Sequence, residues 1–451
     1  MSSPPPSRPV VLGGGMAGIA AAVALAGEGR RPILLESRPY LGGRTRSFIH
    51  RGTGDEIDNG QHLMMGCYRA TFRLLSLLGT LPLVQLQPAL RVEFRDPDGT
   101  RSVLEAPQGL PSPLDVLAGM LRLGGFNLRE RLALLRPGLG TMLGRRSPEE
   151  TVRQYLNRLG QSRRLQERLW EPIIIATLNT PPERASARLF AEVMRRAFLG
   201  RGDDSRLAFP GPGLSRLIDP AREHIERLGG TVVTGAPATA IEHDQQRFTI
   251  RLKDAPPIHA AGLITALPWR ALQGIASQEL LDALRPAPGP EHEYAPIVSL
   301  YLWYDRDPAD LPAFAALLGT SVQWMFNRRK LGTPPNPAFP GLLSCTISAA
   351  YTETAMTENE MITLADRELR AAFPELRSAR RLDGLVIREK HATFAATPAA
   401  ELRRPASRTT IPGFYIAGDW TATGLPATIE GAVQSGFSAA EEFIGGGRIN
   451  P

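Results

Sequence analysis

The sequence predicts an α/β fold, with one discontinuous Rossmann-like domain and an α+β domain interleaved between its pieces. Three observations predict this fold. A strand, a glycine turn and a helix follow one another over residues 9–26, short strands recur over 210–269, and a strand ending in an acid precedes a helix over 414–444. Strands that alternate with helices are typical of a parallel sheet covered by helices.

Composition limits the class of protein. The 451 residues, of which 43% are apolar and 22% charged, are enough for about two or three structural units. The two cysteines, Cys67 and Cys345, match neither a disulfide framework nor a zinc site, so we expect no metal and a reducing, cytoplasmic compartment. The net charge of +7 comes almost entirely from arginine. No long basic run is interleaved with aromatic residues, so nucleic acid is not an expected partner.

The first predicted element is the strand at residues 9–12, which runs directly into a glycine turn. Gly13 permits the tight turn, Gly15 lets the backbone approach a pyrophosphate, and Gly18 allows the helix to pack close to the strand. The alanine-rich residues 19–26 form that helix, whose free N–H groups attract phosphate. This arrangement explains the apolar run better than a signal peptide does.

A second strand at 32–35 ends at Glu36, where an acid accepts hydrogen bonds from a ribose diol and disfavours a 2′-phosphate. The pattern predicts a dinucleotide site and leaves FAD and NAD both open.

A second glycine turn, with Arg38, Gly43 and Arg44, follows Glu36, and residues 58–62 read Asp-Asn-Gly-Gln-His. This part of the chain resembles the flavin amine oxidase, phytoene desaturase and protoporphyrinogen oxidase superfamily. The resemblance implies FAD as the cofactor, with Glu36 on the adenosine ribose. It also implies that Arg38, Gly43 and Arg44 line the phosphates and ribityl chain, and that Gly60 and Gln61 approach the isoalloxazine ring.

The C-terminal stretch matches the same superfamily. A strand at 414–417 leads to Gly418 and Asp419, and a helix is expected over 433–444. Asp419 is predicted to accept a ribityl hydroxyl, and the N–H groups near Ile429 and Ala432 are predicted to meet the pyrimidine edge of the flavin.

The middle of the chain returns to the same domain. A glycine turn at 210–213 precedes a predicted helix over 214–228, with short strands at 231–233, 238–241, 248–252 and 262–266. The resemblance places the backbone near Ala238 against adenine. The predicted FAD domain is therefore residues 1–69, 210–269 and 396–451, and residues 70–209 and 270–395 form the substrate domain.

Within the substrate domain, residues 110–146 combine leucine with arginine and few acids. Such a segment can lie in a bilayer interface, or it can cover a core with its arginine stems in water. No run of about 18 to 20 apolar residues, which a spanning helix requires, is present. Peripheral association with the inner face of the cytoplasmic membrane is therefore a hypothesis.

The resemblance narrows at residues 58–68, 169–172, 178–186 and 417–436 to the hydroxysqualene dehydroxylase family. It implies reductive dehydroxylation of a lipophilic isoprenoid by hydride from reduced FAD, with an electron donor that the sequence leaves open. An isoprenoid desaturase, an amine oxidase and a non-catalytic flavoprotein scaffold are the alternatives.

A general acid is needed to release the hydroxyl as water. The candidates are His62, Asp58 and Glu430, with His62 first because an imidazolium donates near neutral pH. His62 can instead simply orient the backbone, and Glu430 alone is typical of a helix N-terminus. Neither cysteine is expected to attach the flavin, so FAD is predicted to be non-covalent. Five aromatic residues are candidates for a prenyl tunnel or for core packing: Trp170, Trp303, Trp324, Phe326 and Phe394.

Overall fold

The computed structural model describes residues 8–137, 140, 147–200, 202–211, 213–244, 247–287 and 293–445. A five-stranded parallel sheet lies at its centre, in the order β10–β2–β1–β14–β20. Its strands are β1 (Val10–Leu12), β2 (Ile33–Leu35), β10 (Thr231–Val233), β14 (Leu263–Thr265) and β20 (Phe414–Ile416). They come from three separate stretches of the chain, which confirms the predicted α/β fold with a discontinuous sheet. The exact domain boundaries stay a prediction.

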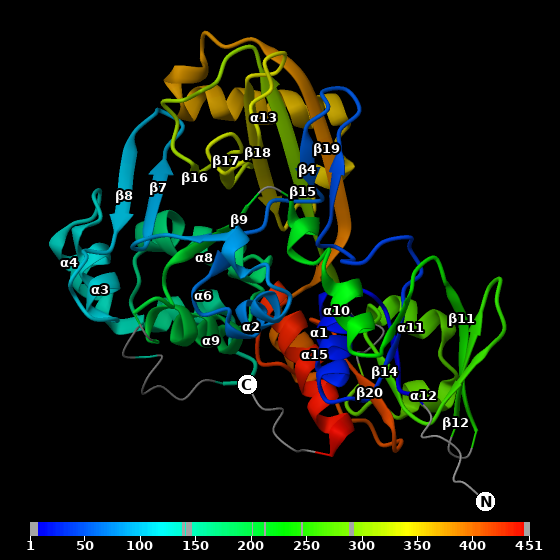
Figure 1. Ribbon diagram of the computed structural model, residues 1–451. Helices are drawn as coiled ribbons and strands as arrows, with labels where there is room; N and C mark the ends of the chain where they lie inside the picture. The colour runs from blue at the N-terminus through cyan, green and yellow to red at the C-terminus, as the bar shows by residue number, and fades with distance from the viewer. Residues whose placement is uncertain are drawn as a thin grey trace, which may run out of the picture.

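Two helices from opposite ends of the chain pack side by side against this sheet (Figure 1). They are α1 (Met16–Gly27) and α15 (Ile429–Ile444). A Cβ added to Gly436 would lie 2.1 Å from the carbonyl oxygen of Ala17. The glycine therefore allows the middle of α15 to touch the backbone at the start of α1.

The predicted helix over 214–228 is wrong in part. A short 3₁₀ turn, η3 (Leu214–Leu217), is followed by a separate helix, α10 (Ala221–Arg227). Pro220 lies between them, and a proline both lacks an N–H group and disfavours helical backbone in the residue before it.

A three-stranded antiparallel sheet completes this half of the molecule, with β11 (Ala238–Asp244), β12 (Arg247–Leu252) and β13 (Ile258–Ala260). Helices α11 (Trp269–Ile275) and α12 (Gln278–Asp282) follow it in the chain.

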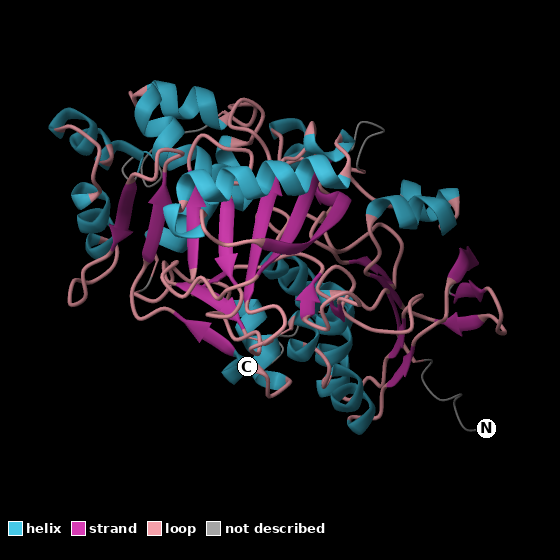
Figure 2. Cartoon of the chain, turned by 90° about the horizontal axis from the view of Figure 1, so that it is seen from above, coloured by secondary structure: helices cyan, strands magenta, loops and turns pink. Residues whose placement is uncertain are grey.

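The second half is built on a seven-stranded mixed sheet, in the order β19–β15–β18–β17–β16–β7–β8. Helix α13 (Glu358–Ala372) lies across one face of this sheet (Figure 2). The strands are β7 (Arg91–Arg95), β8 (Arg101–Glu105), β15 (Tyr294–Tyr304), β16 (Phe314–Leu317), β17 (Trp324–Asn327), β18 (Gly341–Ser348) and β19 (Arg381–Phe394).

Smaller elements join the two halves. The strands are β3 (Ser47–Ile49), β4 (Glu56–Asp58), β5 (Met64–Met65), β6 (Val84–Leu86) and β9 (Leu207–Pro210), and the helices are α2 (Arg69–Leu77), α6 (Val152–Arg158), α8 (Glu171–Leu178), α9 (Ala187–Phe198) and α14 (Pro398–Leu402). Strands β5 and β6 both pair with β9.

The leucine-rich segment contains helices α3 (Leu114–Arg122) and α4 (Leu128–Ala133). Val116, Met120 and Leu134 are buried, whereas Leu128 is 74% exposed and Leu132 is 56% exposed. Core packing and surface exposure therefore both occur in this segment. Residues 138, 139 and 141–146 of the predicted segment lie outside the described residues. Within the described parts of the chain, no helix has the length and apolar character needed to cross a bilayer.

Candidate functional site

The first glycine turn has the geometry of a dinucleotide cradle. A Cβ added to Gly18 would lie only 1.8 Å from the carbonyl oxygen of Gly13, so this glycine is required by the turn itself. A Cβ added to Gly15 would meet no atom within 4 Å. The backbone at Gly15 therefore faces open space in front of the N-terminus of α1, where free N–H groups favour an anion.

The second glycine turn packs directly onto the first. The Gly42 N–H donates to the carbonyl oxygen of Gly14 at 2.8 Å, and Gly15 and Gly42 form a β-bridge. Gly43 has a φ of +60°, and its Cβ would lie 3.3 Å from the Cα of Gly15. The two turns thus form one continuous backbone surface, followed at once by the Arg44 side chain.

Glu36 lies at the end of β2 as predicted, and its carboxylate is buried. The N–H groups of Gly14 and Arg38 each donate to it at 2.7 Å. The loop before β11 runs alongside, because Ala236 N–H donates to the carbonyl oxygen of Glu36 at 2.9 Å. Ala238, which begins β11, is therefore brought close to Glu36.

Arg44 joins the second glycine turn to the C-terminal stretch. Its guanidinium lies 2.7 Å from the Asp419 carboxylate and also donates to the carbonyl oxygen of Ala392. The negative charge of Asp419 raises the pKa of Arg44. The Arg44 side chain is 41% exposed even though it is ion-paired, so it keeps donors free for a further anionic group.

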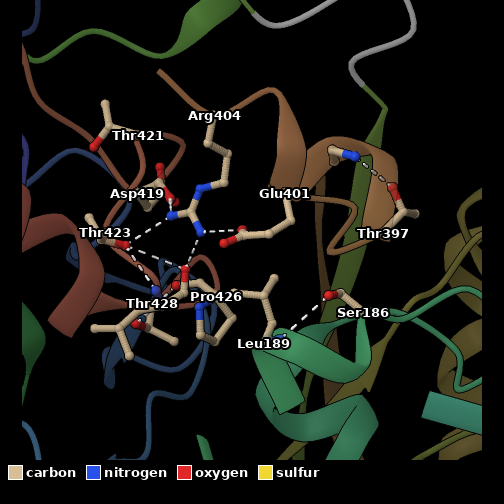
Figure 3. Close-up of polar contacts among 12 residues, drawn as sticks. Ser186, Leu189, Thr397, Glu401, Arg404, Asp419, Thr421, Thr423, Pro426 and Thr428 are labelled. Atoms are coloured by element: carbon tan, nitrogen blue, oxygen red, sulfur yellow. Dashed lines mark hydrogen bonds and ion pairs between the residues drawn. The ribbon is translucent and has the colours of Figure 1, made fainter. Parts of the chain in front are cut away.

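The loop between β20 and α15 carries Gly418 and Asp419. Figure 3 shows Asp419 in this loop. The Gly418 N–H donates to Ser435 Oγ at 2.7 Å, and Thr428 caps α15 by accepting from Gly431 N–H at 3.1 Å. The Ala432 N–H donates to the carbonyl oxygen of Thr428 at 3.0 Å, so contact of the N–H groups near Ile429 and Ala432 with the flavin stays a prediction. These features fit FAD: an open helix N-terminus, a cation, and carboxylates at Glu36 and Asp419.

The segment Gly60–Gln61–His62 follows β4. A Cβ on Gly60 would lie 3.0 Å from Ser299 Oγ on β15, so the loop touches the second sheet. His62 Nδ1 lies 2.8 Å from the carbonyl oxygen of Gly60. Burial lowers the pKa of His62. A lowered pKa makes the imidazolium form of His62 less available near neutral pH, contrary to what we expected from the sequence.

Asp58 forms a buried ion pair that the sequence did not reveal. Its carboxylate lies 3.1 Å from Nη2 of Arg328, and both side chains are 1% exposed. Ser47 Oγ and Leu214 N–H donate to the same carboxylate at 2.7 and 2.9 Å. Nη1 of Arg328 donates to Gln61 Oε1 at 2.5 Å. The pairing gives Asp58 a role in holding the loop that begins after β4.

Glu430 caps a different helix. Its carboxylate accepts the N–H groups of Ala70 and Thr71 at 2.9 Å each, and the hydroxyl of Thr71 at 2.7 Å. These donors belong to the first turn of α2, so Glu430 ties α15 to α2. Burial raises the pKa of Glu430, but all of these contacts favour its charged form. A structural role for Glu430 was expected at the start of its own helix, whereas the contacts observed are with the first turn of α2.

Several other candidates are resolved by their contacts. The indole N–H of Trp170 donates to Gln161, and that of Trp303 donates to Asp55, so both are tied into the core. A prenyl tunnel lined by the other aromatic residues stays a prediction. Burial raises the pKa of the Cys67 thiol to about 12, which disfavours a reactive thiolate. Among the described residues, no three His, Cys, Asp or Glu side chains group as metal ligands would.

Comparison with known proteins defines the class. The family described as flavin containing amine oxidoreductase matches residues 16–444. The chain belongs to this family, and it is an FAD-dependent oxidoreductase. The superfamily and the cofactor predicted from the sequence are thereby confirmed, whereas non-covalent attachment of FAD stays a prediction.

Individual relatives narrow the resemblance. The chain is 32% identical to a hydroxysqualene dehydroxylase of Rhodopseudomonas palustris, over 97% of this chain and 98% of that one. It is 26% identical to a 15-cis-phytoene desaturase of an Oncidium hybrid, over 97% of this chain and 78% of that one. The structure of an oxidoreductase from Methanosarcina mazei superposes with a TM-score of 0.73 at 16% identity, covering 96% of this chain and all of that one. This last similarity concerns the fold alone.

Proposed function

We propose that the protein replaces the hydroxyl group of hydroxysqualene by hydrogen and releases squalene and water. One observation carries the proposal: a hydroxysqualene dehydroxylase aligns with almost the entire chain, through the substrate domain as well as the FAD motifs. In the reaction the C–O bond breaks, the oxygen takes up a proton and leaves as water, and a C–H bond forms. When bound, reduced FAD supplies the hydride and becomes oxidised.

The residues of this chain have three tasks in such a reaction. The glycine turns, Glu36, Arg44 and Asp419 hold the dinucleotide. The apolar interior excludes water, which would otherwise recapture a carbocation. His62, on the loop beside β15, is our candidate to protonate the departing hydroxyl.

An anaerobic experiment tests the function. Dithionite-reduced holoenzyme is mixed with hydroxysqualene, and flavin reoxidation is followed together with the product by mass spectrometry. We expect one squalene for each flavin reoxidised, with no squalene from free reduced FAD. Reoxidation without squalene would reject the proposal. Reduction of the oxidised enzyme by phytoene or squalene would instead support the desaturase alternative.

His62 gives a prediction about pH. Because burial lowers the pKa of His62, its acid form is lost as the pH rises through a value below 6.5. The rate of squalene formation is therefore expected to fall with rising pH across that range. His62→Gln is expected to lower kcat by about 100-fold or more and to remove this limb of the profile. A variant that keeps the wild-type profile would show that His62 only orients the loop.

We further propose that the protein works at the inner face of the cytoplasmic membrane, where a lipophilic substrate resides. Leu114, Leu128 and Leu132 are exposed on α3 and α4, beside Arg129 and Arg131. Exposed leucine flanked by arginine favours an anionic bilayer surface.

A second group of exposed leucine residues supports the proposal that this side of the molecule faces the membrane. Leu77, Leu81, Leu83 and Leu86 are each at least 37% exposed and precede β7. Because Arg91 at the start of β7 pairs with Glu105 at the end of β8, this group and the segment that leads to α3 leave the hairpin at the same end.

Vesicle sedimentation tests the membrane proposal. Leu128→Glu/Leu132→Glu is expected to weaken binding to phosphatidylglycerol-containing vesicles by about ten-fold or more, because two apolar side chains are replaced by charges. Leu228→Glu, at an exposed leucine after α10, is the control and should bind as the wild type does. Equal binding by all three proteins would contradict the proposed face.

A further inference from the structure

A buried guanidinium holds the loop that carries Asp419 (Figure 3). Arg404 is only 4% exposed. Its Nη1 donates to the Glu401 carboxylate at 2.8 Å and to the carbonyl oxygen of Leu425 at 2.7 Å. Its Nη2 donates to Thr423 Oγ1 at 2.9 Å and to the carbonyl oxygen of Asp419 at 3.1 Å. One side chain therefore fastens three points of the loop to α14.

The loop needs such a partner. Residues 417–428 form turns and bends without regular secondary structure, and Gly418 and Gly424 have φ values of +139° and +73°. Ordering an irregular segment that contains glycine is costly in conformational entropy. A planar guanidinium presents several donors in a fixed arrangement, which suits carbonyl groups that converge from different residues.

We propose that Arg404 is a positioning residue for the flavin site and acts through Asp419. Arg404 binds the backbone carbonyl of Asp419, while the carboxylate of the same residue lies 2.7 Å from Arg44. The two arginines thus hold Asp419 from both sides. If Arg404 is removed, the Asp419 carboxylate loses its fixed direction, and Arg44 loses the partner that aims it at the dinucleotide. The proposal rests on FAD as the cofactor.

Hydrogen bonds from the motif at residues 178–186 hold the segment that precedes Arg404. The Asn179 amide donates to Thr393 Oγ1 at 2.9 Å, Thr180 Oγ1 accepts from Ala396 N–H at 2.9 Å, and Ser186 N–H donates to the carbonyl oxygen of Ala396 at 2.7 Å. These bonds fix the connection from β19 to α14. At the end of β19, the centroid of the Phe394 ring lies 4.8 Å from the guanidinium carbon of Arg404. The motif therefore holds in place the segment that leads to α14 and to Arg404.

Flavin release measures the proposed effect. Holoenzymes of the wild type and of Arg404→Met are diluted, and free FAD is followed by its fluorescence, with visible circular dichroism reporting the surroundings of the bound flavin. We expect Arg404→Met to raise the Kd for FAD by about ten-fold or more and to change the dichroism spectrum. Arg404→Lys keeps the charge but not the forked donors, and should restore thermal stability more than flavin affinity.

Arg370→Met is the matched control. Arg370 on α13 also pairs with a carboxylate, binds the Leu376 carbonyl and lies near an aromatic ring, but it is on the second sheet. We expect this variant to lose stability without loss of flavin affinity. An Arg404→Met enzyme with the same Kd for FAD as Arg370→Met would overturn the proposal.

A milder variant covers the case in which Arg404→Met does not fold. Thr423→Val removes one acceptor of Arg404 in a nearly isosteric way and should raise the Kd for FAD by about two- to five-fold. Wild-type affinity in Thr423→Val, with Arg404→Met unfolded, would overturn the proposal. None of these measurements uses hydroxysqualene, so failure here is distinct from failure of the proposed reaction.

Discussion

Replacing Asp58 by asparagine is expected to lower the free energy of unfolding by about 3–5 kcal/mol, because it leaves the Arg328 guanidinium charged and unpaired in the interior. The Arg328 side chain is buried, and the Asp58 carboxylate is its only charged partner among the described residues. The asparagine oxygen can still accept from Ser47 and Leu214, while its NH2 group replaces the carboxylate oxygen that faces Arg328. Urea unfolding of holoenzyme and of flavin-free protein measures the change.

A double variant provides the control for Asp58. Asp58→Asn/Arg328→Met leaves no unpaired charge and should recover part of the lost stability, since apolar replacement of a buried ion pair is often neutral. Wild-type unfolding of Asp58→Asn would contradict a structural role for this ion pair.

The ion pair also illustrates what sequence patterns do not contain. The strand and helix periods at 9–26 and the acid at Glu36 are local, and these local signals correctly predicted the α/β fold and the position of Glu36 at a strand end. Arg328 and Arg404 carry no such signal. Each is one arginine among many, and only tertiary contact distinguishes a buried guanidinium from a solvated one.

The sequence-based prediction of a helix also failed in part where a proline interrupts the helix. The apolar period over 214–228 favours a helix, but Pro220 divides it into η3 and α10. At Glu430 the position near a helix start was recognised, whereas its bonds to Ala70 and Thr71 depend on how α15 meets α2. The contacts that join elements distant in the sequence are therefore the part of the site that could not be predicted from the sequence.

The first glycine turn allows the cofactor site to be separated from the fold by two adjacent substitutions. Gly15→Ala is expected to raise the Kd for FAD by about 100-fold or more, because the added methyl group occupies the space that a pyrophosphate would take in front of α1. The φ of Gly15 is −76°, which alanine adopts readily, and its Cβ meets no protein atom within 4 Å. The flavin-free variant should therefore unfold within about 0.5 kcal/mol of the wild type.

Gly18→Ala is the contrasting variant, because its Cβ would lie 1.8 Å from the carbonyl oxygen of Gly13 and would force the turn apart. We expect it to lose about 1–3 kcal/mol of stability even without flavin, since the backbone must shift to make room. Flavin fluorescence titration and urea unfolding of both variants measure the two effects. If Gly15→Ala bound FAD as tightly as the wild type, the pyrophosphate of FAD would not lie against Gly15. The proposed binding of FAD by Glu36, Arg44 and Asp419 around this turn would then be contradicted. If it lost flavin while keeping its fold, open space at Gly15 would be the property that makes this turn a cofactor site.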